Sequence, residues 1–95
     1  MEMMIAVANE NRNPISVDKF PKGAKVTHYI VYHVGNFNII GRGKVTTARQ
    51  AIKQMERITQ LGMKADLALY AEDGDRTLLL RETYHMKRTG PEKVA

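Results

Sequence analysis

The sequence predicts an α+β domain in which a small antiparallel sheet carries one amphipathic helix on one face. Residues 25–34 and 37–45 are two extended stretches separated by Gly35-Asn36, a pair typical of a two-residue hairpin turn. Residues 47–62 then have the start signal, stop signal and apolar spacing of a helix. A second hairpin follows around the acidic residues 72–75.

The chain of 95 residues is long enough for a single domain with a small core, which we place at residues 1–88, ahead of a polar C-terminal tail at 89–95. It contains no cysteine, which excludes a disulfide framework, a thiolate metal site and a cysteine nucleophile. The first residues lack the pattern of a signal peptide, and no apolar run approaches the length of a membrane span. We therefore expect a soluble, cytoplasmic protein with no membrane partner.

The stretch before the central hairpin is expected to add one or two short strands to the sheet. Residues 3–8 are an apolar run, residues 9–14 have the composition of a loop, and residues 15–20 are a second extended stretch. Pro21-Lys22-Gly23 then interrupts the chain and leads into the hairpin.

The turn signal sets the register of the central hairpin and therefore the face on which each side chain lies. With Gly35-Asn36 as the loop, Gly41 and Gly43 lie on the core face, and we expect the helix to cross over them. The opposite face would point outward and carry one aromatic and three basic side chains: Lys25, Tyr29, Arg42 and Lys44. The alternative is that its apolar members form a patch that another strand or a second subunit covers: Tyr29, Val31 and Ile40.

The predicted helix has recognisable ends and two distinct faces. Thr47 and Gln50 form a capping box at its start, and Gly62 supplies the C′ residue at its end. An apolar stripe at helical spacing is expected to be buried: Ala48, Ala51, Ile52, Met55 and Ile58. Basic residues recur every four positions on the outer side: Arg49, Lys53 and Arg57.

The second hairpin is expected to turn at the acidic residues 72–75. Pairing about Asp73-Gly74 sets Asp66 opposite Arg81. The same pairing would bring Glu72 against Asp75, and because like charges repel across a strand pair, we expect a four-residue loop.

Positive charge is concentrated in the hairpin and the helix. Nine Lys or Arg residues lie between Lys19 and Lys64 against a single acid, Glu56. Such a local positive field is typical of proteins that bind phosphates. We therefore predict a small non-enzymatic protein that binds nucleic acid, DNA or RNA, through these residues: Lys22, Lys25, Tyr29, Arg42, Lys44, Arg49 and Lys53.

A second hypothesis uses the same basic face for a protein partner. The chain would then be an interaction module or inhibitor, of the kind that viruses and mobile elements encode, and would dock on an acidic protein surface. The open edges of such a small sheet also suit a homodimer.

No pattern in the sequence supports a catalytic, metal or cofactor site. His28 and His33 lie an odd number of residues apart on one predicted strand, so they face opposite sides and cannot share an ion. Residues 72–75 lack the later oxygen ligands of a calcium loop. Gly41-Arg42-Gly43-Lys44 lacks the ending of a phosphate loop. A weaker alternative for this segment is that amides at the start of the helix, with Arg42 and Lys44, hold a phosphate of a nucleic-acid backbone. The competing interpretation is that the segment is a bulged strand end.

Two resemblances to nucleic-acid-binding families agree with this prediction. Residues 37–58 resemble the strand, loop and helix of the Alba chromatin proteins. Gly41-Arg42-Gly43 stands where that family has its Arg-Gly loop, and Ala51, Ile52 and Glu56 match its helix, although residues 25–34 are extended where the family has a helix. The order of hairpin and helix is also similar to the AP2-type and integrase arm-binding domains, whose sheet enters the major groove.

Overall fold

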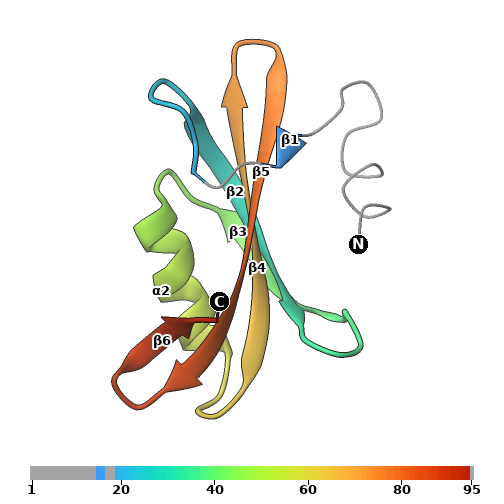
Figure 1. Ribbon diagram of the computed structural model, residues 1–95, viewed down its shortest axis with the longest axis vertical. Helices are drawn as coiled ribbons and strands as arrows, with labels where there is room; N and C mark the ends of the chain where they lie inside the picture. Colours follow the sequence, from blue (N-terminus) through green and yellow to red (C-terminus); the bar gives the residue numbers. More distant parts are fainter. Residues whose placement is uncertain (1–14, 17–18, 95) are drawn as a thin grey trace.

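The described part of the chain folds into one six-stranded sheet with a helix on one side (Figure 1). The computed structural model describes residues 15–16 and 19–94. Its elements are β1 (Ile15–Ser16), β2 (Lys25–His33), β3 (Ile39–Lys44), α2 (Ala48–Ile58), β4 (Lys64–Asp73), β5 (Arg76–Lys87) and β6 (Gly90–Lys93). The strand order is β1-β5-β4-β2-β3, and β6 also pairs with β5.

The predicted α+β class is confirmed, and the sheet differs from the prediction in the parallel pairing of β1 and in the added strand β6. Strands β2 to β6 are antiparallel to their neighbours, but β1 pairs with β5 in parallel. The extended stretch predicted at residues 15–20 contributes only Ile15–Ser16 as strand, and the strand predicted at residues 3–8 lies outside the described residues. Residues 90–93, placed in a polar tail by the sequence, form β6.

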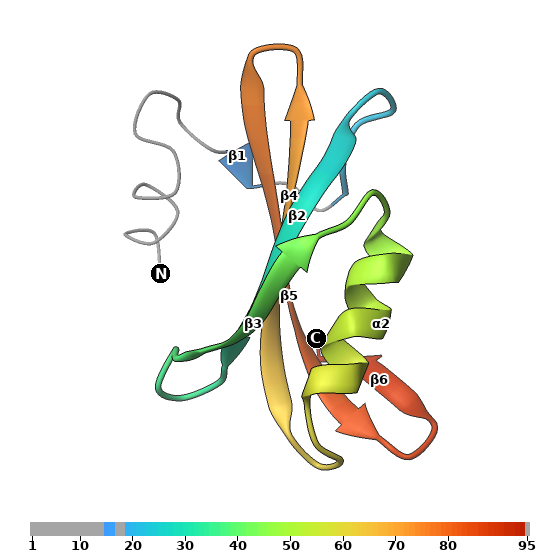
Figure 2. The same cartoon turned by 180° about the vertical axis from the view of Figure 1, so that it is seen from behind.

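Helix α2 packs against one face of the sheet, which we call the helix face (Figures 1 and 2). No helix of residues 15–16 and 19–94 lies on the other face, which we call the helix-free face. Ala51 and Met55 of the helix are fully buried. They pack with side chains of β2 and β4 such as Val31 and Leu67, which are also buried. Burial of this apolar surface is the main stabilising contribution to so small a domain.

The turn of the first hairpin is longer than predicted. The His33 N–H donates to Asn38 O at 2.8 Å and the Phe37 N–H donates to His33 O at 3.0 Å, so residues 34–37 form a four-residue loop. A two-residue type I′ turn needs a positive φ at both loop residues. Here Gly35 (φ 111°) and Phe37 (φ 60°) have it, and Asn36 does not. The predicted Gly35-Asn36 loop is therefore wrong.

A β-bulge at Ile40 then changes the register of the hairpin. Tyr32 pairs with Ile39, but Val31 pairs with Gly41, so Ile40 is an extra residue on β3. Gly41 and Gly43 lie on the helix face, as predicted: a Cβ on Gly41 would be 2.5 Å from Ile58 Cδ1 of α2.

Tyr29 lies on the helix face as well, because the bulge brings it opposite Gly43. Only 5% of Tyr29 is exposed, and it belongs to the same apolar cluster as Met55. Its predicted outward position is therefore wrong. The alternative that Tyr29, Val31 and Ile40 form a covered apolar patch is correct for the patch but wrong for its cover, because the covering element is helix α2 and not another strand or a second subunit.

Helix α2 begins as predicted and ends earlier. Thr47 is the N-cap, and its hydroxyl accepts from the Gln50 N–H at 3.2 Å. The Gln50 side chain bonds the Thr46 N–H instead of the Thr47 N–H. The helix ends at Thr59, whose N–H and hydroxyl both donate to Met55 O, so Gly62 lies in the following turn. Among the described residues, no helix has the length and apolar character required to cross a membrane.

The first and last members of the predicted apolar stripe are less buried than expected. Ala51 and Met55 are buried and Ile52 packs against the core. Ala48 is exposed, and Ile58 is 37% exposed at the last turn.

The second hairpin has a tight turn, so the predicted four-residue loop is wrong. Asp73 pairs with Arg76 across Gly74-Asp75, and Gly74 supplies the positive φ of 67°. In this register Glu72 faces Thr77, so the like-charge contact that favoured a longer loop does not arise. Asp66 faces Thr83, and it reaches Arg81 diagonally at 3.5 Å.

Strand β6 is held against β5 by ion pairs as well as by backbone bonds. Lys93 Nζ lies 2.8 Å from Glu82 Oε2, and Lys87 Nζ lies 2.5 Å from Glu92 Oε1. Burial acts to raise the pKa of Glu82, but hydrogen bonds from Lys93 and Tyr84 outweigh it and hold that pKa below its usual value.

The two glycines of β3 give a test of this packing. A Cβ at Gly43 would lie 3.2 Å from the buried Tyr29 ring, which has little room to move. Gly43→Ala is expected to lower the free energy of unfolding by about 1–3 kcal/mol, the usual cost of overpacking. Gly41→Ala displaces only the end of the half-exposed Ile58 side chain and should cost less than about 1 kcal/mol. Urea unfolding of both variants checks this, and an equal or larger loss for Gly41→Ala would contradict it.

Candidate nucleic-acid interface

Strand β3 directs Arg42 and Lys44 onto the helix-free face. These residues alternate with Gly41 and Gly43, so they point away from α2, and they pair with Ile30 and His28 of β2. Both side chains are exposed, and neither belongs to an ion pair among the described residues. We call Arg42 and Lys44 the strand surface.

An aromatic cluster lies beside the strand surface but does not offer its rings to a ligand. His28 and Tyr70 stack with ring centroids 4.4 Å apart and planes 6° apart. Tyr32 is 5% exposed and Tyr70 is 2% exposed. Burial raises the pKa of Tyr32, and the charges of Arg81 and Arg42 act against this rise. Since a base needs an open ring on which to stack, these side chains do not provide a stacking platform.

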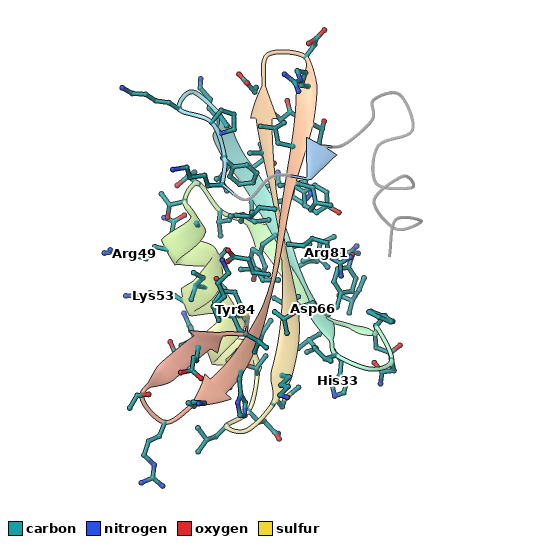
Figure 3. The ribbon with its side chains drawn as sticks, in the orientation of Figure 1. His33, Arg49, Lys53, Asp66, Arg81 and Tyr84 are labelled. Carbon is teal, nitrogen blue, oxygen red and sulfur yellow. The ribbon has the colours of Figure 1, made fainter. Side chains whose placement is uncertain are left out.

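Arg81 also lies on the helix-free face, but its charge makes contacts within the fold. Its guanidinium lies over the Tyr32 ring, 5.9 Å from the centroid, and 3.5 Å from Asp66 Oδ2. Thr83 donates a hydrogen bond to the other oxygen of Asp66. The Arg81 charge is therefore engaged within the fold (Figure 3).

The basic stripe of α2 lies on the opposite side of the molecule. Figure 3 shows Arg49 and Lys53 directed away from the sheet, in the direction opposite to Arg81. Arg57 continues the stripe, and all three side chains are exposed and outside the ion pairs of the described chain. The four-residue spacing corresponds to about 6 Å along the helix axis. The predicted site omitted Arg57, although the four-residue recurrence could have included it.

The turn before β2, which carries Lys22, lies on the same side of the molecule as α2 in both views (Figures 1 and 2). Lys22 is exposed, and Phe20 just before it packs against the core cluster beneath the helix. We therefore group Lys22 with Arg49, Lys53 and Arg57 as the helix surface. Lys25 belongs to neither group, because its cross-strand partner is Glu72.

The structure thus divides the predicted site instead of bringing it together. The strand surface and the helix surface lie on opposite sides of the sheet, Tyr29 is buried between them, and Lys25 faces an acid. The helix start is also partly occupied, because side chains already bond the amides of Thr46 and Gln50.

Other cavities and clusters of the described residues offer less chemistry. No group of three or more His, Cys, Asp or Glu side chains converges in residues 15–16 and 19–94. An open depression of about 260 Å³ lies between the end of α2 and the β5–β6 turn, and its lining includes Glu56 as well as Lys87 and Arg88. Lys87 is engaged with Glu92.

No known protein family matches this chain, and no match is found among curated proteins or among solved structures. The resemblances to the Alba proteins and to the AP2-type domains remain predictions from the sequence.

His28 makes the stability of the helix-free face depend on pH. It is stacked on Tyr70 of β4, bonded to the Thr27 hydroxyl, near the Glu72 carboxylate and opposite Lys44 of β3. Burial lowers the pKa of His28 from 6.5, and the charge of Glu72 only partly opposes this. The unfolded chain therefore binds the proton more readily than the folded one, and stability falls as the pH drops below about 6.5.

His28→Gln should reduce this loss, because it removes the group that titrates. The measurement is urea unfolding of both proteins at about pH 7.5 and about pH 5.5, the range in which histidine changes charge. The wild-type chain is expected to lose more stability between the two than the variant. Equal losses would show that His28 does not carry the effect.

Proposed function

We propose that this chain is a small non-enzymatic nucleic-acid-binding protein that contacts DNA or RNA phosphates through the helix surface. The observation that carries the proposal is the stripe of Arg49, Lys53 and Arg57, which are exposed and outside the ion pairs of the described residues. Arg49 and Lys53 are directed away from the sheet (Figure 3). Lys22 is a further exposed cation of the helix surface.

The charge pattern of α2 favours a polyanionic ligand. Like charges four residues apart destabilise a helix by about 0.2–0.5 kcal/mol per pair. The repulsion between Arg49 and Lys53, and between Lys53 and Arg57, disappears when phosphates lie between them. Binding also releases the counterions condensed on the nucleic acid, which is the main source of affinity for such ligands.

The contact is expected to be to the backbone more than to the bases. The helix of 11 residues is about 16 Å long, which suits a groove or a run of phosphates along one strand. Tyr29, Tyr32 and Tyr70 are all buried and cannot stack on bases. Phosphate contacts position a protein without specifying a sequence. We therefore expect weak sequence preference.

The test is a binding panel of single- and double-stranded DNA and RNA at several salt concentrations. Arg49→Gln/Lys53→Gln should weaken binding and reduce the slope of log affinity against log salt by about 0.9 for each lost contact to duplex DNA, or about 0.7 for single strands. Glutamine keeps a good helix propensity, so the fold is retained. Arg42→Gln/Lys44→Gln is the matched control, since it removes the same charge from the other side and should leave the slope unchanged.

A substitution of Glu56 is expected to change the affinity in the opposite direction. It is the only acid of α2 and lies three residues after Lys53, and the two side chains form none of the ion pairs of the described residues. Glu56→Gln should strengthen binding, because it removes repulsion of the phosphates. Equal effects of the two charge-removing pairs, binding that does not respond to salt, or no binding to any of the four nucleic acids would overturn the proposal.

A further inference from the structure

Strand β3 lies at one end of the sheet. It is the last strand in the order β1-β5-β4-β2-β3, and no strand of the described residues pairs with its outer side. At the other end, β5 pairs with β1 at Leu78 and Leu79 and with β6 from Tyr84 to Lys87, and these two outer strands have only two and four residues. Among the described strands, β3 with its six residues is therefore the longest that has no partner on its outer side.

The ladder geometry directs the backbone groups of two residues outward from this edge. The Val45 N–H donates to Thr27 O at 3.3 Å, so these two residues bond to each other across the hairpin. Bonded and non-bonded pairs alternate in an antiparallel ladder. The next bonded pair is Gly43 with Tyr29, which leaves the N–H and C=O groups of Arg42 and Lys44 pointing away from β2.

The two sides of this edge differ in chemistry. On the helix-free side lie the cations Arg42 and Lys44, which have no ion-pair partner within residues 15–16 and 19–94. On the helix side Gly41 has no side chain, and the Ile58 side chain that covers it is 37% exposed. An added strand would therefore meet positive charge on one face and an apolar surface on the other.

We propose that the edge of β3 binds an extended segment of another protein in which acidic and apolar residues alternate. The segment joins the sheet as a further strand, bonds the backbone of Arg42 and Lys44, places its carboxylates beside their side chains and packs its apolar residues near Ile58. This surface is distinct from the helix surface, so it does not depend on nucleic-acid binding.

A second copy of this chain is a poorer occupant of the same edge. Two β3 strands related by a twofold axis would bring Arg42 and Lys44 of both copies together on one face. Like charges side by side destabilise a strand pair. Charge complementarity therefore selects an acidic segment over self-association.

The probe is a fluorescent synthetic peptide of alternating Glu and Val, with a Lys-Val peptide of the same length as its control. Lys44→Gln should weaken binding of the Glu-Val peptide about twofold to fivefold, the usual size of one cross-strand ion pair. Lys44→Pro removes the same charge and also the outward N–H, without removing a bond to β2. It should weaken binding at least tenfold further, while Arg49→Gln/Lys53→Gln leaves binding unchanged.

A second measurement keeps the proposal testable if Lys44→Pro does not fold. Amide hydrogen exchange of the wild-type chain should slow at Arg42 and Lys44 when the Glu-Val peptide is added, and stay unchanged at Gly43. The proposal is overturned if those amides are not protected, if the Lys-Val peptide binds equally well, or if Lys44→Pro and Lys44→Gln bind alike. Displacement of the peptide by DNA through Arg42 and Lys44 would assign the edge to nucleic acid instead.

Discussion

The arrangement of the molecule depends on the close approach of α2 to the glycine side of β3. Gly41 has no side chain, so Ile58 Cδ1 of the helix can lie 2.5 Å from the position that a Cβ would take, and the Tyr29 ring lies 3.2 Å from the corresponding position at Gly43. The bulge at Ile40 brings Val31 and Tyr29 of β2 opposite the two glycines. Alternation along β3 places Arg42 and Lys44 on the other face. The bulge therefore determines which side chains of β2 share the helix face with the glycines, and alternation determines where the cations lie.

The sequence predicted local structure correctly where a single residue type strongly favours one conformation or position. It was ambiguous where both faces of a strand are equally apolar. Thr47 caps the helix because its hydroxyl satisfies a free amide, and the glycines of β3 face the helix because little else fits. Strand β2 is different, since Tyr29 and Val31 on one side and Ile30 and Tyr32 on the other are equally suited to a core. Alternation alone could not choose between them, and an extra residue such as Ile40 leaves no mark in composition. The helix end was misplaced for a similar reason: Thr59 closes it with its own hydroxyl before Gly62 is reached.

A count of charges along the sequence locates the basic residues of the candidate site but not the faces on which they lie. Residues 19 to 64 hold an excess of Lys and Arg, but this excess does not indicate the direction in which each side chain points. Side chains alternate between faces along a strand, while they gather on one face every three or four residues along a helix. Arg42 and Lys44 therefore project from the sheet away from α2, and Arg49 and Lys53 project from the helix away from the sheet. A continuous basic block in sequence becomes two separate surfaces in space, each with its own geometry.

The features that open β3 to an acidic strand are the same ones that protect it from aggregation. Natural sheets guard exposed edges with bulges, short strands and charged side chains, and β3 has all three. Such protection depends on the charge of the approaching strand. A positive edge repels copies of itself, and a neutral strand gains little electrostatic stabilisation from it. An acidic strand is stabilised at each cation. Specificity arises from what an interface rejects as much as from what it accepts. The bulge at Ile40 adds to this, since it limits regular pairing to residues 41–44 and so restricts the register in which a partner can join. The charge that keeps the edge free in isolation is therefore also the feature that would define its partner.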